Sequence, residues 1–333
     1  MISKRFLTAF FILLLLPAAL YSQEIKLGTT IPPGSPWDYA LQELSNRWSD
    51  LSGGRYRLRP YMGGIAGTEE DMIRKTRIGH LQAVVLTGSG LSDISSDTLA
   101  LSLPLFIQSE EELSYLLEKM NSRLNALLEE KGFTVIAWQR AGWLRIFSKH
   151  PAATPADLRT HKLALPIENN TFQQIWRSMG FNIVSLSSND FLTGLQTGMV
   201  DAIVSAPLMA AAYQWFPLAP NMMDVAFAPL LGALLIDTRV WNRIPADLRA
   251  EMLQAAQEIL TPVEEQIMAL EAEAVALMRG MNVRVVPVPE PVMREWRDVS
   301  SRGYHSIIGT TVSRELYSEM EALLTEFRQS KER

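Results

Sequence analysis

The chain has 333 residues, and its contents of 47% hydrophobic and 20% charged residues are typical of a globular protein. This length predicts about two domains. A net charge of −5 with scattered basic residues argues against a nucleic-acid-binding protein, and the absence of cysteine excludes disulfides, thiolate metal sites and a cysteine nucleophile.

Residues 1–22 have the pattern of a secretory signal peptide. Lys4 and Arg5 form a positive n-region, an apolar stretch follows at 6–16, and small residues lead to a cleavage site at Ser22. The apolar stretch is too short for a spanning helix, although an uncleaved N-terminal anchor is the alternative. We therefore expect a periplasmic protein that is soluble after signal-peptide cleavage.

The first part of the mature chain predicts alternating strands and helices. Strands are expected at 24–29, 56–61 and 81–86, with helices at 37–51 and 68–78 between them. This β-α-β-α-β order indicates a parallel α/β unit.

The middle of the chain predicts a second α/β set after two further helices and two short strands. The helices are expected at 109–117 and 121–131, and the strands at 133–139 and 143–148. The second set comprises strands at 162–166, 183–186 and 200–204, with helices at 171–179 and 190–196. Ligands bind beyond the carboxyl ends of such parallel strands.

The last third predicts one long helix, at 245–278, in which Pro262 should cause a kink. A strand at 283–288 and two terminal helices follow. The chain therefore crosses between two lobes more than once. We assign 23–141 and 230–269 to lobe I, and 142–229 and 270–333 to lobe II.

The sequence shows no catalytic constellation. Its four histidines lack partners at metal-binding spacing, and no GxSxG, HExxH, GxGxxG or P-loop motif is present. We therefore expect no enzyme activity, no metal and no cofactor. A chain with two predicted lobes and a predicted signal peptide, but no catalytic motif, is typical of a solute-binding protein. Such proteins close around their ligand by a hinge motion.

Several segments resemble the DctP-type solute receptors of TRAP transporters, in the same order and with matching spacing. These segments are GRYRLRPYMGGIAGTEEDMIRKTRIGHLQAVVLTGSGL, LPLFIQSEEEL, DLRTHKLALP, NDFLTGLQTGMVDAIVSAP and WNRIPADLRAEMLQAAQEI. The resemblance implies an α/β fold with two lobes, mixed sheets, hinge strands and a long helix spanning both lobes. It also implies a ligand in the interlobe cleft and delivery to membrane permease subunits.

The sequence departs from this family at the residue that usually grips an organic acid. The arginine of the family's "KIRVP" strand is replaced by Ala164, and a second arginine found in some members falls at Leu144. Arg145 is adjacent to Leu144 but should face the opposite side of the strand. Because an unpaired buried carboxylate is costly, this variant without the clamping arginine should prefer a neutral or hydrophobic ligand.

We expect the ligand to contact a mainly apolar set of side chains, although several of these aromatics are equally explained as core. The expected apolar contacts are Trp37, Trp138, Leu144, Ala164, Phe172, Met209, Tyr213 and Trp215. The expected polar contacts are Thr30, Asn169, Asn170, Ser205 and Arg145.

Three other functions stay open at this point. The chain is alternatively a receptor for an organic acid bound by non-standard residues. It is alternatively a sensing module that acts through a periplasmic partner without transport, and a tetratricopeptide-repeat protein is such a partner in resembling receptors. An enzyme would need titratable groups in the cleft, such as Asp38, Arg140 and Arg145.

Overall fold

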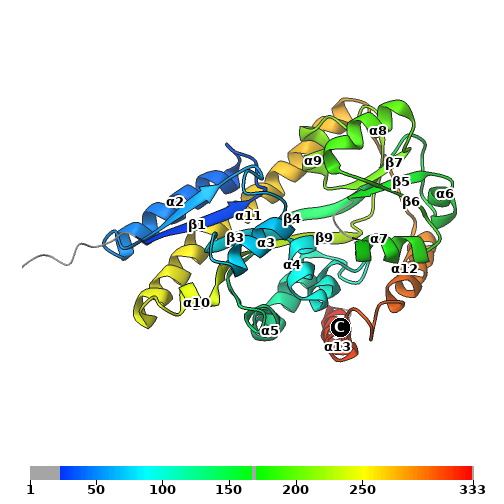
Figure 1. Ribbon diagram of the computed structural model, residues 1–333. Helices are drawn as coiled ribbons and strands as arrows, with labels where there is room; N and C mark the ends of the chain where they lie inside the picture. Colours follow the sequence, from blue (N-terminus) through cyan, green and yellow to red (C-terminus); the bar gives the residue numbers. More distant parts are fainter. Residues whose placement is uncertain (1–22, 167–169, 332–333) are drawn as a thin grey trace, which may run out of the picture.

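The computed structural model describes residues 23–166 and 170–331. The predicted signal peptide and the predicted ligand contact Asn169 lie outside the described residues. The chain forms two α/β lobes that are joined by long strands and by one long helix (Figure 1). No helix among the described residues is long and apolar enough to cross a membrane.

Lobe I begins with the predicted parallel unit. Its elements are β1 (Gln23–Thr29), α2 (Pro36–Leu51), β2 (Tyr56–Tyr61), α3 (Glu69–Arg77) and β3 (Ala83–Thr87). Strand β1 pairs in parallel with both β2 and β3. Helix α2 begins at Ser35, whose side chain accepts a bond from the backbone N–H of Asp38, and α3 begins with a capping box between Thr68 and Asp71.

A helical segment that the sequence predicted only in part separates β3 from the next strand. It comprises α4 (Gly88–Ile94), the 3-10 helix η1 (Ser96–Ser102) and α5 (Glu110–Glu129). The two helices expected at 109–117 and 121–131 are one helix. No residue in the intervening segment breaks helical geometry, so α5 continues through it.

Two long antiparallel strands connect the lobes. They are β4 (Phe133–Ser148) and β9 (Ala228–Asp237). Strand β9 pairs with β3 in lobe I, and β4 pairs with β9 along its first part and with β7 (Ala202–Ser205) along its last part. The strands expected at 133–139 and 143–148 are therefore one strand, irregular between Arg140 and Trp143.

Lobe II contains the second α/β set. Its remaining elements are α6 (Pro155–Arg159), β5 (Lys162–Pro166), α7 (Asn170–Ser178), β6 (Asn182–Leu186), η2 (Ser188–Asp190), α8 (Phe191–Thr197), α9 (Pro207–Ala212) and β8 (Asn221–Met223). Strand β5 pairs in parallel with β6 and β7. The described strands follow the order β2-β1-β3-β9-β4-β7-β5-β6, with β8 paired to β4.

The C-terminal part adds helices to both lobes. Its elements are α10 (Thr238–Trp241), α11 (Ala246–Gly280), β10 (Arg284–Val286), α12 (Glu290–His305) and α13 (Arg314–Lys331). Helix α11 has 35 residues, remains helical on both sides of Pro262, and runs from the α10 side of the molecule to the α9 side (Figure 1). It packs against α2, β4 and α9.

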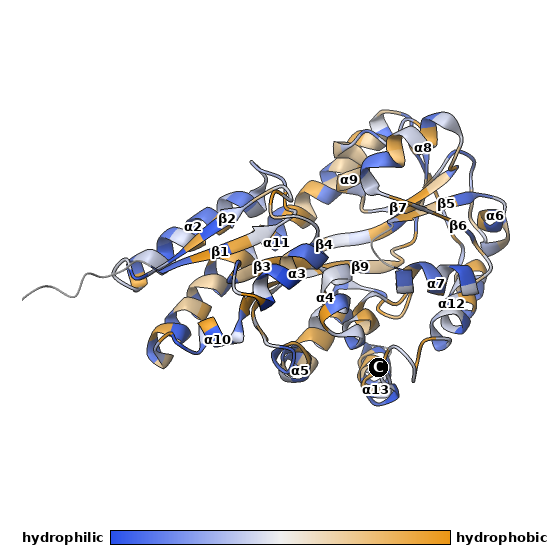
Figure 2. Cartoon of the chain, viewed as in Figure 1, coloured by the Kyte–Doolittle hydropathy of each residue, from blue (hydrophilic) through white to orange (hydrophobic). Residues whose placement is uncertain are grey.

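Buried apolar side chains fill the space between sheet and helices. Figure 2 shows hydrophobic residues along the strands. In lobe II they form two cores on opposite faces of β5. Leu163 and Leu165 belong to the Trp176 core, which extends to α5, α12 and α13. Ala164 belongs to the Trp215 core, which also contains Phe147, Phe191, Ile203 and Met278. The alternation follows from the two-residue period of a strand.

Candidate functional site

The candidate site is built around Ala164, the residue predicted to replace the family's arginine. Ala164 has no exposed surface and packs in the Trp215 core. Its neighbour across the sheet is Ile203 of β7, which in turn faces Phe147 of β4. These three residues form one apolar row on the face that α8 and α9 cover. All three side chains are buried, so this row carries hydrocarbon and no charged group.

The next row of the same face is polar. Arg145 pairs with Ser205 across β4 and β7, two residues along each strand from Phe147 and Ile203. Side chains two residues apart on a strand share a face, so Arg145 lies on the side of Ala164. Leu144 points to the opposite face and packs against the Trp176 core. Sequence comparison placed Arg145 and Leu144 on opposite faces, and the structure adds that Arg145 shares the face of Ala164.

Arg145 is held by an acidic residue that the sequence analysis did not select. Its Nη1 donates to Oδ1 of Asp224 at 3.0 Å, and Asp224 directly follows β8, which pairs with β4. The Asp224 side chain is 53% exposed, whereas the Arg145 side chain is 23% exposed. The buried Nε of Arg145 has no hydrogen-bond partner among the described residues. The guanidinium is therefore neutralised but only partly saturated.

Two glutamates of α11 lie against the irregular part of β4. The register shift lies between Arg140 and Trp143, which pair with Leu231 and Pro229 of β9 on its two sides. Glu264 accepts from Arg140 N at 3.1 Å, and Glu271 accepts from Trp143 N at 3.3 Å. The glutamates are seven residues apart, which places them on one face of the helix. Through these hydrogen bonds α11 is fixed to β4, the strand shared by both lobes.

Glu271 is the most perturbed carboxyl at this junction. Burial raises its pKa to about 7, while the Trp143 N–H and the charge of Arg145 act in the opposite direction. Its Oε2 is buried and has no hydrogen-bond partner in the described part of the chain. Gly142, with φ of +99°, makes room for this carboxyl: a Cβ there would be 1.8 Å from Oε2.

Arg140 belongs to a separate ion network. Its Nε donates to Glu264 at 2.6 Å, and its Nη1 contacts Glu110 and Ser114 of α5. Burial raises the pKa of Glu264, and the Arg140 guanidinium opposes this. Asp38, which the enzyme alternative grouped with the two arginines, instead accepts from Gly34 N and from the side chain of Gln42.

The other predicted contacts in lobe II lie around the two cores. Trp215 is buried and stacks with Tyr213, which is 45% exposed; Met209 on α9 is 36% exposed. Phe172 is buried in the Trp176 core, and Asn170 is exposed at the start of α7. Ser205 is buried, and its hydroxyl donates to the carbonyl of Ala206 at 3.1 Å.

The remaining predicted contacts come from lobe I and from the strand that joins the lobes. Thr30 is exposed directly after β1, and Trp37 is buried in the lobe I core. Leu208 of α9 packs against that same core, so α9 touches both lobes. The Trp138 indole donates to Asn125 at 2.9 Å and packs between two cores. These contacts stay predictions because the structure holds no solute.

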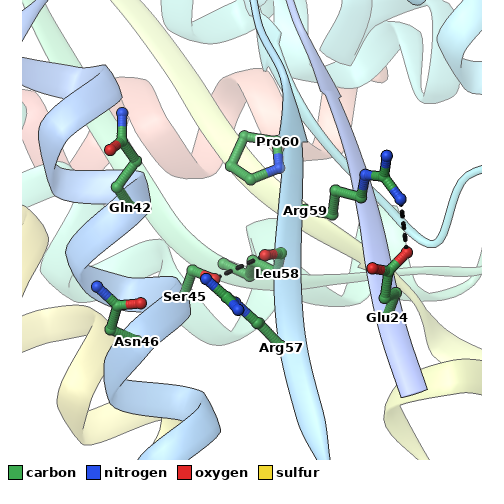
Figure 3. Close-up of a pocket in the computed structure, with 8 residues that line it drawn as sticks. All are labelled: Glu24, Gln42, Ser45, Asn46, Arg57, Leu58, Arg59 and Pro60. Atoms are coloured by element: carbon green, nitrogen blue, oxygen red, sulfur yellow. Dashed lines mark hydrogen bonds and ion pairs between the residues drawn. The ribbon is translucent and has the colours of Figure 1, made fainter. Parts of the chain in front are cut away.

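One described pocket lies away from this site. It is formed by side chains of α2, β1 and β2 and has a volume of about 380 Å³. Figure 3 shows Arg59 reaching Glu24 on one side and Arg57 pointing toward α2 on the other. All of its lining residues belong to lobe I. It is therefore a surface feature of the sheet edge and not the interlobe site.

The sequence analysis missed Asp224, Glu264, Glu271 and Gly142. For the glutamates a signal existed, because two acids seven residues apart lie in the buried stripe of a long helix. Nothing local marks Asp224, whose partner is 79 residues away. Among the described residues no group of three His, Cys, Asp or Glu side chains is placed to hold a metal ion.

The comparison with protein families gives one match. Residues 27–310 match the model of DctP, described as bacterial extracellular solute-binding protein, family 7. A curated solute-binding protein of Chromohalobacter salexigens is 25% identical over 172 residues, and this alignment covers 51% of each chain, so the match spans about half the length of that relative.

Two further relatives carry ligand names. The 2,3-diketo-L-gulonate-binding periplasmic protein YiaO of Escherichia coli is 22% identical over 247 residues, covering 72% of this chain and 74% of YiaO. A TRAP periplasmic solute-binding protein of Desulfovibrio salexigens, solved with bound orotic acid, superposes with a TM-score of 0.80 at 16% identity, covering 90% of this chain and 99% of that structure. The likeness confirms the predicted two-lobed fold.

Proposed function

Because the chain belongs to the DctP family of bacterial extracellular solute-binding proteins, we propose that it serves a TRAP-type transporter as receptor for an uncharged solute with an apolar body. The family consists of receptors and not enzymes, so solute binding is its activity. The proposal concerns the chemistry of the solute, its site between the lobes and its delivery to a membrane permease.

The single observation that carries the proposal is the environment of Ala164. It packs without exposed surface among Phe147, Phe191, Ile203 and Trp215, in the place of the family's cation. A carboxylate beside this row would lose its hydration without gaining a cation, at a cost of several kcal/mol. An apolar group would instead gain about 25 cal/mol for each Å² of buried surface.

A second candidate solute is an organic acid, as the names of YiaO and of the orotic-acid complex suggest for those proteins. Arg145 is the observation that favours it, because its Nε lacks a partner among the described residues and its guanidinium shares the face of Ala164. An acid would need to replace Asp224 at this guanidinium. The two candidate solutes therefore differ in whether Arg145 binds the solute or stays paired with Asp224.

The direct test is mass spectrometry of the solute that co-purifies with the protein, followed by titration with that compound. We expect an uncharged molecule whose affinity does not change in Arg145→Met. An organic acid whose binding disappears in Arg145→Met would contradict the proposal. If nothing co-purifies, thermal-shift titrations with matched carboxylic acids and primary amides decide between the two candidates.

A gain-of-function variant gives an independent test. Ala164→Arg should restore acid binding, because a guanidinium matches a carboxylate with two parallel hydrogen bonds. Ala164→Leu is the matched control, since it adds volume without charge. Because Ala164 is fully buried, the melting temperature of each variant must first show a folded protein. Equal acid binding by both variants would argue against a missing clamp.

Two proposals on partners accompany the receptor function. We expect binding to TRAP permease subunits, with a periplasmic tetratricopeptide-repeat protein as an intermediate for an apolar solute. The alternative is a sensing module without transport. Co-purification of permease subunits with the solute-loaded receptor supports transport, whereas a complex with a sensor kinase and no permease supports sensing.

A further inference from the structure

The position of Asp224 relative to Arg145 has a consequence for selectivity. Strand β4 lies between β7 and β8, so Arg145 has Ser205 on one side and Asp224 on the other. The ion pair is thus a cross-strand contact on the face that carries Ala164. Met222, two residues before Asp224, packs in the Trp215 core with Phe147, which confirms the shared face.

The pair has the geometry of an occupied carboxylate site. A guanidinium nitrogen and a carboxylate oxygen lie 3.0 Å apart, as in recognition of an acidic solute, but the carboxylate belongs to the protein. A tethered partner acts at an effective concentration of about millimolar or more. A free carboxylate far below that concentration leaves the pair intact.

The neighbouring charges reinforce this preference. Glu271 lies close enough to Arg145 to interact with its charge, so two acids surround one arginine. An anionic solute would add a further negative group beside Asp224 and the partly ionised Glu271. A neutral solute adds no charge and leaves the Arg145–Asp224 pair intact.

We propose that Asp224 is a selectivity residue that occupies Arg145 as an internal anion and thereby excludes carboxylate solutes from the lobe II part of the site. The inference rests on the proposed function, because it explains how a receptor of this family rejects acids while keeping a guanidinium. Asp224 tolerates substitution because its side chain is largely exposed and its backbone N–H is bonded to Val286.

The test follows the Arg145 Nε–H directly by nitrogen-15 NMR of the full mature chain, with acetate as the probe and acetamide as its neutral counterpart. The Arg145 signal is assigned by its loss in Arg145→Met. In Asp224→Asn the signal should respond to acetate at concentrations at least ten-fold lower than in the wild type. Asp298→Asn, which removes an exposed acid on α12, is the matched charge control and should behave as the wild type.

The inference is supported if Asp224→Asn responds to acetate at ten-fold lower concentrations and Asp298→Asn does not. Asp224→Ala should then respond as Asp224→Asn does. Equal acetate responses in wild type and Asp224→Asn, or no response in either, overturn it. If acetate shifts the wild-type signal at low concentration, the uncharged-solute proposal loses its support as well. If only Ala164→Arg gains acid binding, the inference fails while the proposed function stands.

Discussion

Two arginines of the same strand, five residues apart, serve different purposes. Arg140 bonds Glu264 through its Nε and contacts Glu110 and Ser114. Arg145 forms an ion pair with the exposed Asp224. Their side chains are similarly buried, at 25% and 23% exposure. The burial of the arginine side chain therefore does not distinguish a structural arginine from a candidate binding residue. The number of acidic partners and the burial of those partners do distinguish them.

The difference arises from the irregular part of β4. Arg140 lies where the ladder is interrupted, and its environment is filled by α5 and α11. Arg145 lies beyond the interruption, where β4 again pairs regularly with β7 and β8. We assign the first region to the packing of the lobes and propose that the second region contacts the solute. The following predictions test this division, from the largest expected effect to the smallest.

Replacing Arg140 should be the most damaging change. Arg140→Met leaves Glu264 buried without its cation, and breaking a buried pair in this way costs about 3–5 kcal/mol. Urea unfolding at pH 7 measures the loss. A loss no larger than that of Arg145→Met would contradict the division between the two arginines.

Adding a methyl group at Gly142 should be nearly as costly. In Gly142→Ala the new Cβ meets the Glu271 carboxyl at 1.8 Å, and the residue must also keep a positive φ. Strain and the displaced buried carboxyl together predict a loss of roughly 3 kcal/mol in unfolding free energy. Gly198→Ala is the control, because φ there is +73° but no atom lies within 4 Å, so only about 1 kcal/mol of strain remains.

Glu271 should make the protein less stable as pH rises. Its folded pKa of about 7 lies above its ordinary value of 4.5, so the folded state binds the proton more tightly than the unfolded state. The stabilising protonation is complete below about pH 4.5 and is lost as pH rises through about 7. The difference between the two pKa values corresponds to roughly 3 kcal/mol.

Thermal unfolding of Glu271→Gln between pH 5 and 8 measures this contribution. The variant should lose less stability over that range than the wild type, because glutamine does not ionise. Parallel curves for the two proteins would show that Glu271 titrates normally.

Replacing Arg145 should have the smallest effect on stability. Asp224 is largely exposed, so Arg145→Met should change the unfolding free energy by under about 1 kcal/mol. Urea unfolding at pH 7, as for Arg140→Met, measures this change in unfolding free energy. A loss comparable to that of Arg140→Met would mean that Arg145 is a structural residue, and the selectivity proposal would lose its basis.

Most of the fold was predictable from local pattern. The five elements between residues 24 and 86 are present in the predicted order, and Gly198 ends α8 in the left-handed conformation expected of a C-terminal glycine. The merged strand β4 was not predicted, because residues 140–142 were left as a gap between the strands expected at 133–139 and 143–148. Partners on α11, more than a hundred residues away, keep that segment in the sheet.

The site was predictable only in part. The resemblance predicted that Ala164 replaces the family's arginine, and the sequence analysis selected Arg145 and Ser205 separately. Their placement in adjacent rows of one face required the register between β4, β5 and β7. The sequence around Asp224 indicates no role for it. Asp224 becomes a candidate only through its ion pair with Arg145, which the pairing of β8 with β4 brings close.

The sequence by itself determined the family and the two α/β lobes, since periodicity and motif spacing are local properties of the chain. The tertiary structure alone decided which charges meet. Salt bridges and buried carboxyls depend on strand register and on helix placement across large separations, and neither Asp224 beside Arg145 nor Glu271 beside Gly142 is encoded in spacing along the chain.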